Sequence, residues 1–397
     1  MGTKGPPAES RHFGMFLRGL REDRRLSLDT VEEMSAGLPE RLTKSHLSRI
    51  ENGRAIPTFP RMFALSQIYG IPVAYLAERF EVSLMHGMFP PPSTTEPVEQ
   101  VLVEARRLRR AGRHAEELVL YEALLERQRA SPDERKSEWT IRVQLERVNC
   151  LAKLSRWATA KEECERLLGS TTLTPRQRVI ALEIFATTCY KLGKHTVAMM
   201  AIDRAEAELA SLTEQDEVQR LRATLTVLKG NTQFVTQQFA AAADAFRTSV
   251  DAFEKIGNDF EACRARLNLA VALMELGSRS RSRELLEQAL RAAENGGYDR
   301  QRAYAHGHLG LLGWREGDLD GAEAHCLRSN GIARPREYVS LLWRNCYYLW
   351  KIAVSRKDEA ATRANERTLK TYLGRVEEYM PEVDEFKSFL GRGNDDD

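Results

Sequence analysis

The sequence predicts an all-α protein with a short helical head followed by a long α-solenoid of about seven helical hairpins. Three observations predict this class. Apolar residues recur with the period of an amphipathic helix over most of the 397 residues. The two-residue alternation of a half-buried strand is nearly absent. Beyond residue 100, short breaks in the helical pattern recur about every 40 residues, which is typical of stacked repeats.

The head, residues 11–80, is expected to contain five helices. Ser27 and Thr43 are suitable N-caps for the second and third of them, and Gly53 suits the end of the third. The stretch 56–80 supplies the fourth and fifth helices. The inward apolar positions of the first three helices are Phe13, Phe16, Leu17, Leu20, Leu28, Val31, Met34, Leu47 and Ile50.

Four pieces of the head occur in a characteristic order: "LRGLREDRRLS", "SHLSRIENG", "IPTFPRMFALSQIYGIP" and "AYL". Together they resemble the XRE/lambda-repressor-like helix-turn-helix family over about 65 residues. The resemblance implies that the third helix enters the major groove of double-stranded DNA. The alternative is a helical cap that no longer binds DNA, in which Lys44 and Arg49 are part of an ordinary solvated face.

The resemblance also assigns roles to single residues. Arg49 would present its guanidinium fork to guanine, and Asn52 would contact the DNA backbone. His46 either contacts a base or is a surface residue. The family also pairs an Arg of the first helix with a Glu that closes the third, here Arg21 and Glu51, and that pair would be structural. The full expected DNA-binding set is Lys44, Ser45, His46, Ser48, Arg49, Asn52 and Arg41.

Two features of the head depart from the family pattern. The family often has a phosphate-holding Gln at the start of the second helix, where this chain has Leu28. The turn before the third helix is about five residues longer than usual, because "SAGLPERL" occupies it. We expect this insertion either to shift the recognition helix or to add a DNA contact through Arg41.

Residues 81–99 are expected to be a linker, since "MHGMFPPPSTTEP" at 85–97 holds four prolines and has little periodicity. Residues 100–390 then form the repeats. A small residue usually follows five positions after each break, so that two helices can approach closely. The breaks are Gly112, Ser155, Gly193, Gln237, Gly277, Gly317 and Lys357, and the small residues are Ala160, Ala198, Ala242, Ser282 and Ala322.

The repeats resemble a tetratricopeptide-type array with units longer than the usual ~34 residues. A helix-turn-helix head fused to such an array resembles the RRNPP group of regulators. That resemblance implies a homodimer with paired heads and a peptide ligand in the concave groove of the array.

Asn side chains on the first helices of several hairpins suggest how a peptide could be held. An Asn offers a donor and an acceptor together, so it can pair with an extended peptide backbone. Arg264, with Arg266 and Arg302, could bind a carboxylate. The alternative is that these Asn residues lie on solvated helix faces. The expected groove residues are Asn149, Asn231, Asn268, Arg264 and Asn345.

Composition and charge indicate where the protein is located, what state its cysteines are in and which partners it can have. No apolar run approaches the ~18 residues of a membrane span, and the first ten residues lack a signal core, so we expect a cytoplasmic protein without a membrane partner. Six scattered cysteines predict reduced, buried thiols, and the alternative is a redox switch. Residues 1–80 hold 12 Lys and Arg against 9 Asp and Glu, a net charge of +3, whereas the whole chain has a net charge of +2. The positive charge of the head permits nucleic-acid binding there.

Enzyme and metal functions are not expected. The chain has no phosphate-binding glycine loop, HExxH or GxSxG motif. His306 and His308 are two positions apart and do not share a helix face, although His325 and Cys326 follow nearby. We therefore expect no cofactor and no metal. The basic run at 106–110 fits a solvated helix better than a phosphate contact.

The function that the sequence favours is a sequence-specific DNA-binding transcription regulator whose repeats mediate dimerisation and sense a peptide or protein. The alternative is a protein-interaction scaffold whose head is a tether or a remnant.

Overall fold

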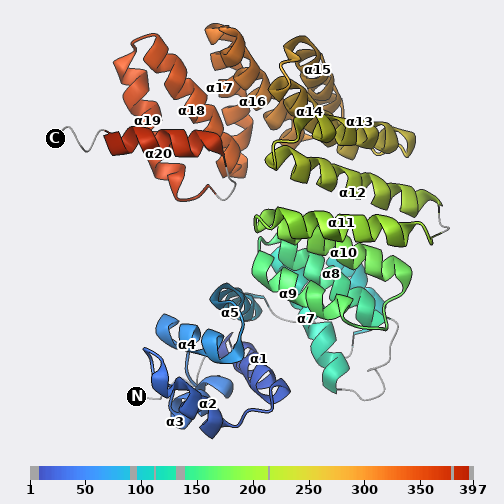
Figure 1. Ribbon diagram of the computed structural model, residues 1–397, viewed down its shortest axis with the longest axis vertical. Coiled ribbons are helices and arrows are strands. Elements are labelled where there is room, and N and C mark those ends of the chain that lie inside the picture. Colours follow the sequence, from blue (N-terminus) through green and yellow to red (C-terminus); the bar gives the residue numbers. More distant parts are fainter. Residues whose placement is uncertain are drawn as a thin grey trace. The chain divides into compact units, whose positions relative to one another are not determined.

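The computed structural model describes residues 9–89, 96–110, 113–130, 139–212, 215–376 and 380–392. Within these ranges the chain is helical and contains no strand, which confirms the all-α prediction (Figure 1). No helix among the described residues is long and apolar enough to cross a membrane. The five head helices are α1 (Glu9–Asp23), α2 (Leu28–Met34), α3 (Lys44–Glu51), α4 (Phe59–Tyr69) and α5 (Val73–Met88).

Local sequence signals set the helix ends in the head. The Ser27 hydroxyl accepts a hydrogen bond from the Thr30 backbone N–H at 3.0 Å, and the Thr43 hydroxyl accepts one from the His46 N–H at 3.2 Å. Both caps satisfy N–H groups that a helix start leaves unpaired. Gly14 brings α1 against the end of α3, since a Cβ there would lie 2.5 Å from the Ile50 carbonyl oxygen.

The insertion before α3 is packed into the head. Residues Ser35–Gly37 form a 3₁₀ turn, and the Ser35 hydroxyl accepts a hydrogen bond from the Leu42 N–H at 2.9 Å. Leu42 is fully buried in the head core. Arg61 anchors the outer side through Glu40 at 3.1 Å. The longer turn therefore has fixed internal contacts of its own.

The expected linker over 81–99 is wrong at both of its ends. Helix α5 continues to Met88, and α6 begins at Val98; residues 90–95 lie outside the described residues. The second half of α5 stays helical because Val82 and Met85 pack into the core of the first repeats. Its first half places Leu76 in the head core, so that one helix belongs to both cores.

Beyond the head, fourteen described helices form the seven expected hairpins, and one more helix follows. In chain order they are α6 (Val98–Arg110), α7 (His114–Ala130), α8 (Trp139–Lys153), α9 (Trp157–Leu168), α10 (Pro175–Lys191), α11 (His195–Leu209), α12 (Gln215–Val235), α13 (Phe239–Lys255), α14 (Asp259–Glu275), α15 (Arg279–Asn295), α16 (Asp299–Glu316), α17 (Leu319–Ala333), α18 (Val339–Ser355), α19 (Glu359–Leu373) and α20 (Pro381–Arg392).

The predicted breaks are the turns within the hairpins. Six of the seven have a left-handed backbone, including the non-glycine residues Ser155 (φ 58°), Gln237 (φ 61°) and Lys357 (φ 59°). The seventh, Gly112, lies outside the described residues. A single left-handed residue ends one helix and lets the next fold back against it.

The predicted small residues lie where the paired helices touch. Ala160, Ala198, Ala242, Ser282 and Ala322 are all fully buried. The Ser282 hydroxyl donates to the Ala270 carbonyl at 2.8 Å, so its polar atom is satisfied in the interior. All six cysteines are buried and free, as expected, and burial raises the pKa of each thiol.

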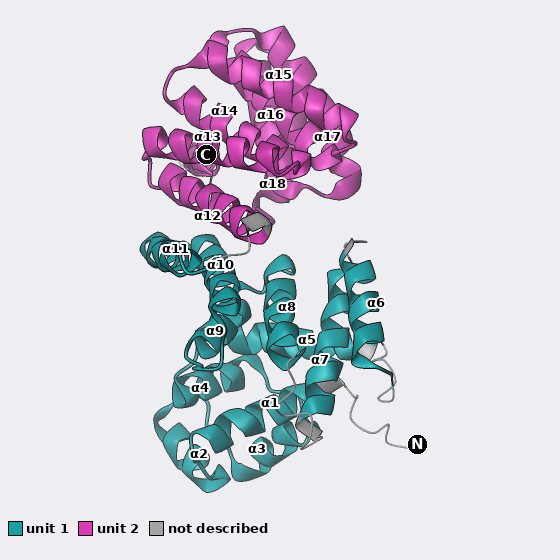
Figure 2. Ribbon diagram, turned by 90° about the vertical axis from the view of Figure 1, so that its right-hand side faces the viewer, with its two compact units in different colours: residues 1–212 teal, residues 213–397 magenta. Residues whose placement is uncertain are grey.

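The chain divides into two compact units, residues 1–212 and 213–397 (Figure 2). The first unit joins the head to the first three hairpins. The second holds the other four hairpins and α20, whose Phe386 is fully buried beside Trp343 and Trp350. Helix α20 thereby covers apolar surface that the last hairpin would otherwise expose to water.

Candidate nucleic-acid interface

Helix α3 has one buried and one open face. Leu47 and Ile50 point into the head core, each 2% exposed. Ser45 and Arg49 are exposed on the other side, and Ser48 and His46 are half-buried. Arg49 makes no ion pair with any described residue. Its guanidinium therefore stands free to meet an acceptor outside the chain.

The expected pair between Arg21 and Glu51 is present and fixes α3 against α1. The Arg21 Nε and Nη2 atoms donate to the two Glu51 carboxylate oxygens at 2.7 and 2.9 Å. Arg21 also donates to the Leu26 carbonyl at 2.9 Å. Glu51 is only 4% exposed, and its hydrogen bond raises the pKa of Arg21. This bidentate contact defines the orientation in which α3 presents its open face.

Asn52 joins the end of α3 to α1. Its side-chain oxygen accepts from Arg18 Nη2 at 2.8 Å, while its amide nitrogen donates to the Ser48 carbonyl at 2.7 Å. The expected DNA-binding set did not include Arg18 or the exposed Arg54, which also lie beside α3. Arg18 lies one turn before Arg21 on α1, and Arg54 follows the left-handed Gly53.

Two acidic residues of α2 contact the start of α3. The Glu32 carboxylate accepts from the Lys44 backbone N–H at 2.7 Å, and Lys44 Nζ pairs with Asp29 at 2.8 Å. Arg41 lies 3.6 Å from Glu32. Two of the expected DNA-binding residues, Lys44 and Arg41, are thus paired within the head. Both are exposed ion pairs, which are weak and can exchange for phosphate.

Leu28 occupies the position where the resembled family often has Gln. It packs as a half-buried residue against the head core, and its neighbour Ser27 caps the helix instead.

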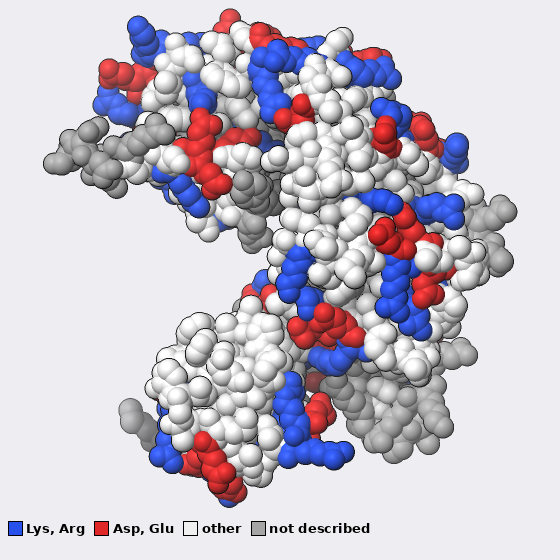
Figure 3. Space-filling model, in the orientation of Figure 1, with Lys and Arg blue, Asp and Glu red and all other residues white. Residues whose placement is uncertain are grey.

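On the face of the repeats shown in Figure 3, acidic and basic side chains are interspersed and form no single-sign field.

The repeats bring together two of the expected groove residues. The Asn268 amide donates to the Asn231 side-chain oxygen at 3.1 Å, across 37 residues of sequence. Asn149 is half-buried on α8 in the first unit. Arg264 is exposed and pairs with Glu261 at 2.6 Å.

The expectation that Asn345 lines a groove is wrong. This residue is 1% exposed. Its amide nitrogen donates to the Ser329 hydroxyl at 2.8 Å and to the Asn330 side-chain oxygen at 2.9 Å. Gly307 packs directly against it. Asn345 therefore bridges three helices inside the second unit and cannot reach a peptide.

Two polar clusters bring potential metal ligands together. His306 and His325 approach through their Nδ1 atoms at 3.0 Å, and burial lowers the pKa of both, that of His306 to about 4. His114, Glu117 and Cys150 also lie close enough together to share an ion. The Glu117 carboxylate, however, already accepts from Arg109 at 2.6 Å, so a guanidinium occupies the place of a cation.

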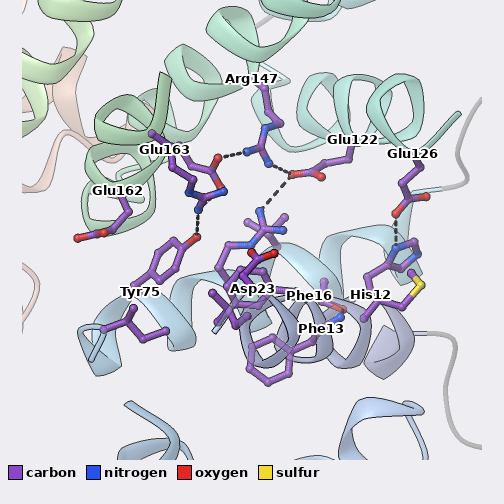
Figure 4. A pocket seen from close by; sticks show the side chains of 18 of the residues that line it. His12, Phe13, Phe16, Asp23, Tyr75, Glu122, Glu126, Arg147, Glu162 and Glu163 are labelled. Atoms are coloured by element: carbon purple, nitrogen blue, oxygen red, sulfur yellow. Dashed lines mark hydrogen bonds and ion pairs between the residues drawn. The ribbon is translucent and has the colours of Figure 1, made fainter. Parts of the chain in front are cut away.

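The head is bonded to the repeats mainly through α5. Glu78 accepts hydrogen bonds from the Ala158 and Thr159 N–H groups at 3.3 and 2.7 Å, and so caps the start of α9. Arg166 donates to the Tyr75 hydroxyl at 2.7 Å. His12 of α1 pairs with Glu126 of α7 at 2.7 Å (Figure 4). These contacts join the head to the second hairpin and to α7 within the first unit.

Comparison with known proteins assigns the head. Residues 12–78 match the model of a helix-turn-helix domain family. The head is a helix-turn-helix domain. None of the curated proteins matches the chain in sequence.

Solved structures resemble the chain in fold. A Rap protein complexed with competence and sporulation factor has a TM-score of 0.57 at 14% identity, covering 71% of this chain and 78% of its own. A signal-transduction ATPase with a tetratricopeptide repeat sensor from Pyrococcus horikoshii has a TM-score of 0.52 at 11% identity, over 98% of this chain and 64% of its own.

A third similar structure is aspartyl phosphate phosphatase F from Bacillus subtilis, with a TM-score of 0.50 at 12% identity, over 99% of this chain and 92% of its own. These likenesses show a tetratricopeptide-like solenoid behind the head. They confirm the architecture that the sequence predicted.

Proposed function

We propose that this protein is a sequence-specific DNA-binding transcription regulator whose repeats mediate dimerisation and sense a peptide or protein ligand. The observation that carries the proposal is the open face of α3. Arg49 and Ser45 project from a helix that the Arg21–Glu51 pair holds rigidly against the head. A guanidinium presented in this way can bind the O6 and N7 atoms of guanine.

The proposal includes homodimerisation because one head alone would read too few base pairs to select an operator. One short recognition helix contacts few base pairs, and two heads on adjacent half-sites supply the remaining specificity. The repeats are the larger part of the chain and are available to hold two copies together. A ligand that favours one arrangement of the heads over another would shift the population that fits the operator.

The Asn231–Asn268 pair supports the peptide-sensing part. Each side chain retains further hydrogen-bonding capacity beyond their mutual 3.1 Å bond, and both residues are half-buried on the first helices of neighbouring hairpins. The Rap protein of similar fold was solved in complex with competence and sporulation factor. We propose that these two Asn residues pair with the backbone of a peptide ligand.

The second candidate is an interaction scaffold whose head does not read DNA. The carboxylates of Asp29 and Glu32 favour it, because they lie at the start of α3 and would repel phosphate. Binding assays at several salt concentrations separate the two candidates. In DNA binding, log K falls with log salt at a slope of about −0.9 per phosphate contact.

The test is a selection of DNA sequences from a random library by the purified protein, followed by binding at several salt concentrations. The regulator predicts an enriched motif and a steep salt dependence that persists with competitor DNA. A scaffold predicts no enrichment. Asn231→Ala with Asn268→Ala tests the peptide part separately: unchanged binding of a cognate peptide in the double variant would contradict it, without bearing on the DNA result.

A further inference from the structure

A cavity of about 940 Å³ lies within the first unit, between the head and the repeats (Figure 4). Side chains from α1, α5, α7, α8 and α9 line it. Phe13, Phe16 and Tyr75 give it an aromatic wall. A second hollow of about 420 Å³ adjoins it, and the two share Arg147 and Glu163 in their walls, together with Arg166.

A chain of alternating charges runs along this shared wall. Arg79 contacts Glu122 at 3.3 Å, Arg147 contacts Glu122 at 2.6 Å and Glu163 at 2.7 Å, and Arg166 lies 3.5 Å from Glu163. Burial alone would raise the pKa of Glu122, but Arg147 and Arg79 outweigh it and hold that pKa well below its usual range. The chain thus contains three guanidinium groups and two charged carboxylates, so it carries one excess positive charge.

The other ionisable groups at the cavity wall lie outside this chain of charges. His12 pairs with Glu126 at 2.7 Å, Asp23 and Arg24 are adjacent in the sequence, and Glu162 lies 3.4 Å from Lys161, a residue that does not line the cavity. The hydrogen bond to Glu126 raises the pKa of His12, which favours its charged form. Burial lowers the pKa of His86, which favours its neutral form.

Several buried donors at the cavity wall have no partner. The Nε atoms of Arg79 and Arg147 are buried and make no hydrogen bond with any described residue. Arg147 as a whole is 5% exposed. In the adjoining hollow, the Thr140 hydroxyl is likewise unpartnered, on a residue 8% exposed. Buried polar groups are normally hydrogen-bonded, so unpaired donors beside an open cavity indicate a place for an acceptor.

We propose that this cavity binds a carboxylate carried on an apolar or aromatic body. The carboxylate would lie between Arg79 and Arg166, which end the charge chain, and would neutralise its excess. The apolar body would pack on Phe16 and Tyr75. The guanidinium of Arg79 already stacks 4.8 Å from the Phe16 ring centre, so the charged and aromatic surfaces are contiguous.

Such a ligand would act on the head directly. Arg79 and Tyr75 belong to α5, which is part of the head, whereas Arg166 belongs to α9 of the repeats. A carboxylate bound to both arginines adds a bridge between the two parts. This site is separate from the Asn231–Asn268 pair, which lies in the other unit. The proposal does not depend on the DNA-binding function.

The carboxylate could come from a free organic acid or from the C-terminus of a peptide. We would titrate the full-length protein by calorimetry with phenylacetate and with acetyl-leucyl-phenylalanine, each beside its primary amide. We expect at least one acid to bind, with its amide roughly tenfold weaker or worse. The acid that binds more tightly identifies the source. Equal binding of acid and amide, or no binding of either acid at millimolar concentration, would overturn the proposal.

Three variants make the test specific. Arg166→Gln removes one end of the charge chain from a side chain that is 62% exposed, so the fold should persist. We expect it to weaken acid binding roughly tenfold. Glu162→Gln makes the wall more positive and should strengthen acid binding. Arg142→Gln, exposed on α8 away from the cavity, should change nothing. Acid affinity that moves equally in all three, or in none, would refute a carboxylate site.

Discussion

Replacing Glu51 by Ala tests whether the Arg21–Glu51 pair holds α3 against α1. The variant leaves the Arg21 guanidinium, 12% exposed, without its bidentate partner. Removing one member of a buried ion pair typically costs about 3–5 kcal/mol. Arg21 keeps the Leu26 carbonyl and lies 3.5 Å from Glu22, so we expect the lower end, about 3 kcal/mol.

Hydrogen exchange measured by mass spectrometry can detect this loss within the full chain. Where exchange reports the opening equilibrium, about 3 kcal/mol corresponds to roughly 150-fold faster exchange in peptides from α1 and α3. Peptides from the second unit should be unaffected.

Glu22→Gln is the matched control. It removes another carboxylate near Arg21, but one that is 60% exposed, and exposed pairs contribute about 0–1 kcal/mol. Exchange in α1 and α3 that is as slow in Glu51→Ala as in Glu22→Gln would refute the reasoning, because the pair would then not hold the helix.

Further predictions concern pH and packing. The pKa of His12 is raised in the folded protein by Glu126, so its stabilising contribution is complete below about pH 6.5 and is lost as the pH rises through the folded pKa; His12→Gln should remove that dependence in thermal melts. In denaturant titrations, Gly310→Ala should lower the free energy of unfolding by about 1–3 kcal/mol, since the new Cβ would lie 2.5 Å from the buried sulfur of Cys326. Gly331→Ala has open space around it and should raise the free energy of unfolding by up to about 1 kcal/mol. Asn345→Ala should lower stability by about 1–3 kcal/mol and leave peptide affinity unchanged in calorimetry.

Local chemistry explains what the sequence could predict. The turns of the repeats could be located because a left-handed residue interrupts each hairpin. Ser155, Gln237 and Lys357 are not glycines, but their regular spacing along the chain indicated that they lie at turns. The small residues followed from the need for close helix contact. The pair of Arg21 and Glu51 came from the family resemblance and lies as expected.

Tertiary packing explains what the sequence could not predict. Asn231 and Asn345 are the same residue type on equivalent first helices, yet one is half-buried and the other is enclosed by neighbouring helices. The charge chain between Arg79 and Arg166 joins residues 87 positions apart along the chain. Proline-rich composition suggested a linker, but Val82 and Met85 show that apolar contact with the repeats extends α5 beyond the head.

The most direct test of the central claim is the affinity of the full-length protein for its selected DNA, measured by fluorescence anisotropy. We would compare the wild type, Arg49→Ala and Arg142→Ala, of which the last removes an exposed arginine on α8. If α3 reads DNA, Arg49→Ala should weaken binding by about 1–3 kcal/mol, relax the preference at one base pair, and leave Arg142→Ala like the wild type. Equal affinities for all three proteins, or loss without any change in base preference, would contradict the claim.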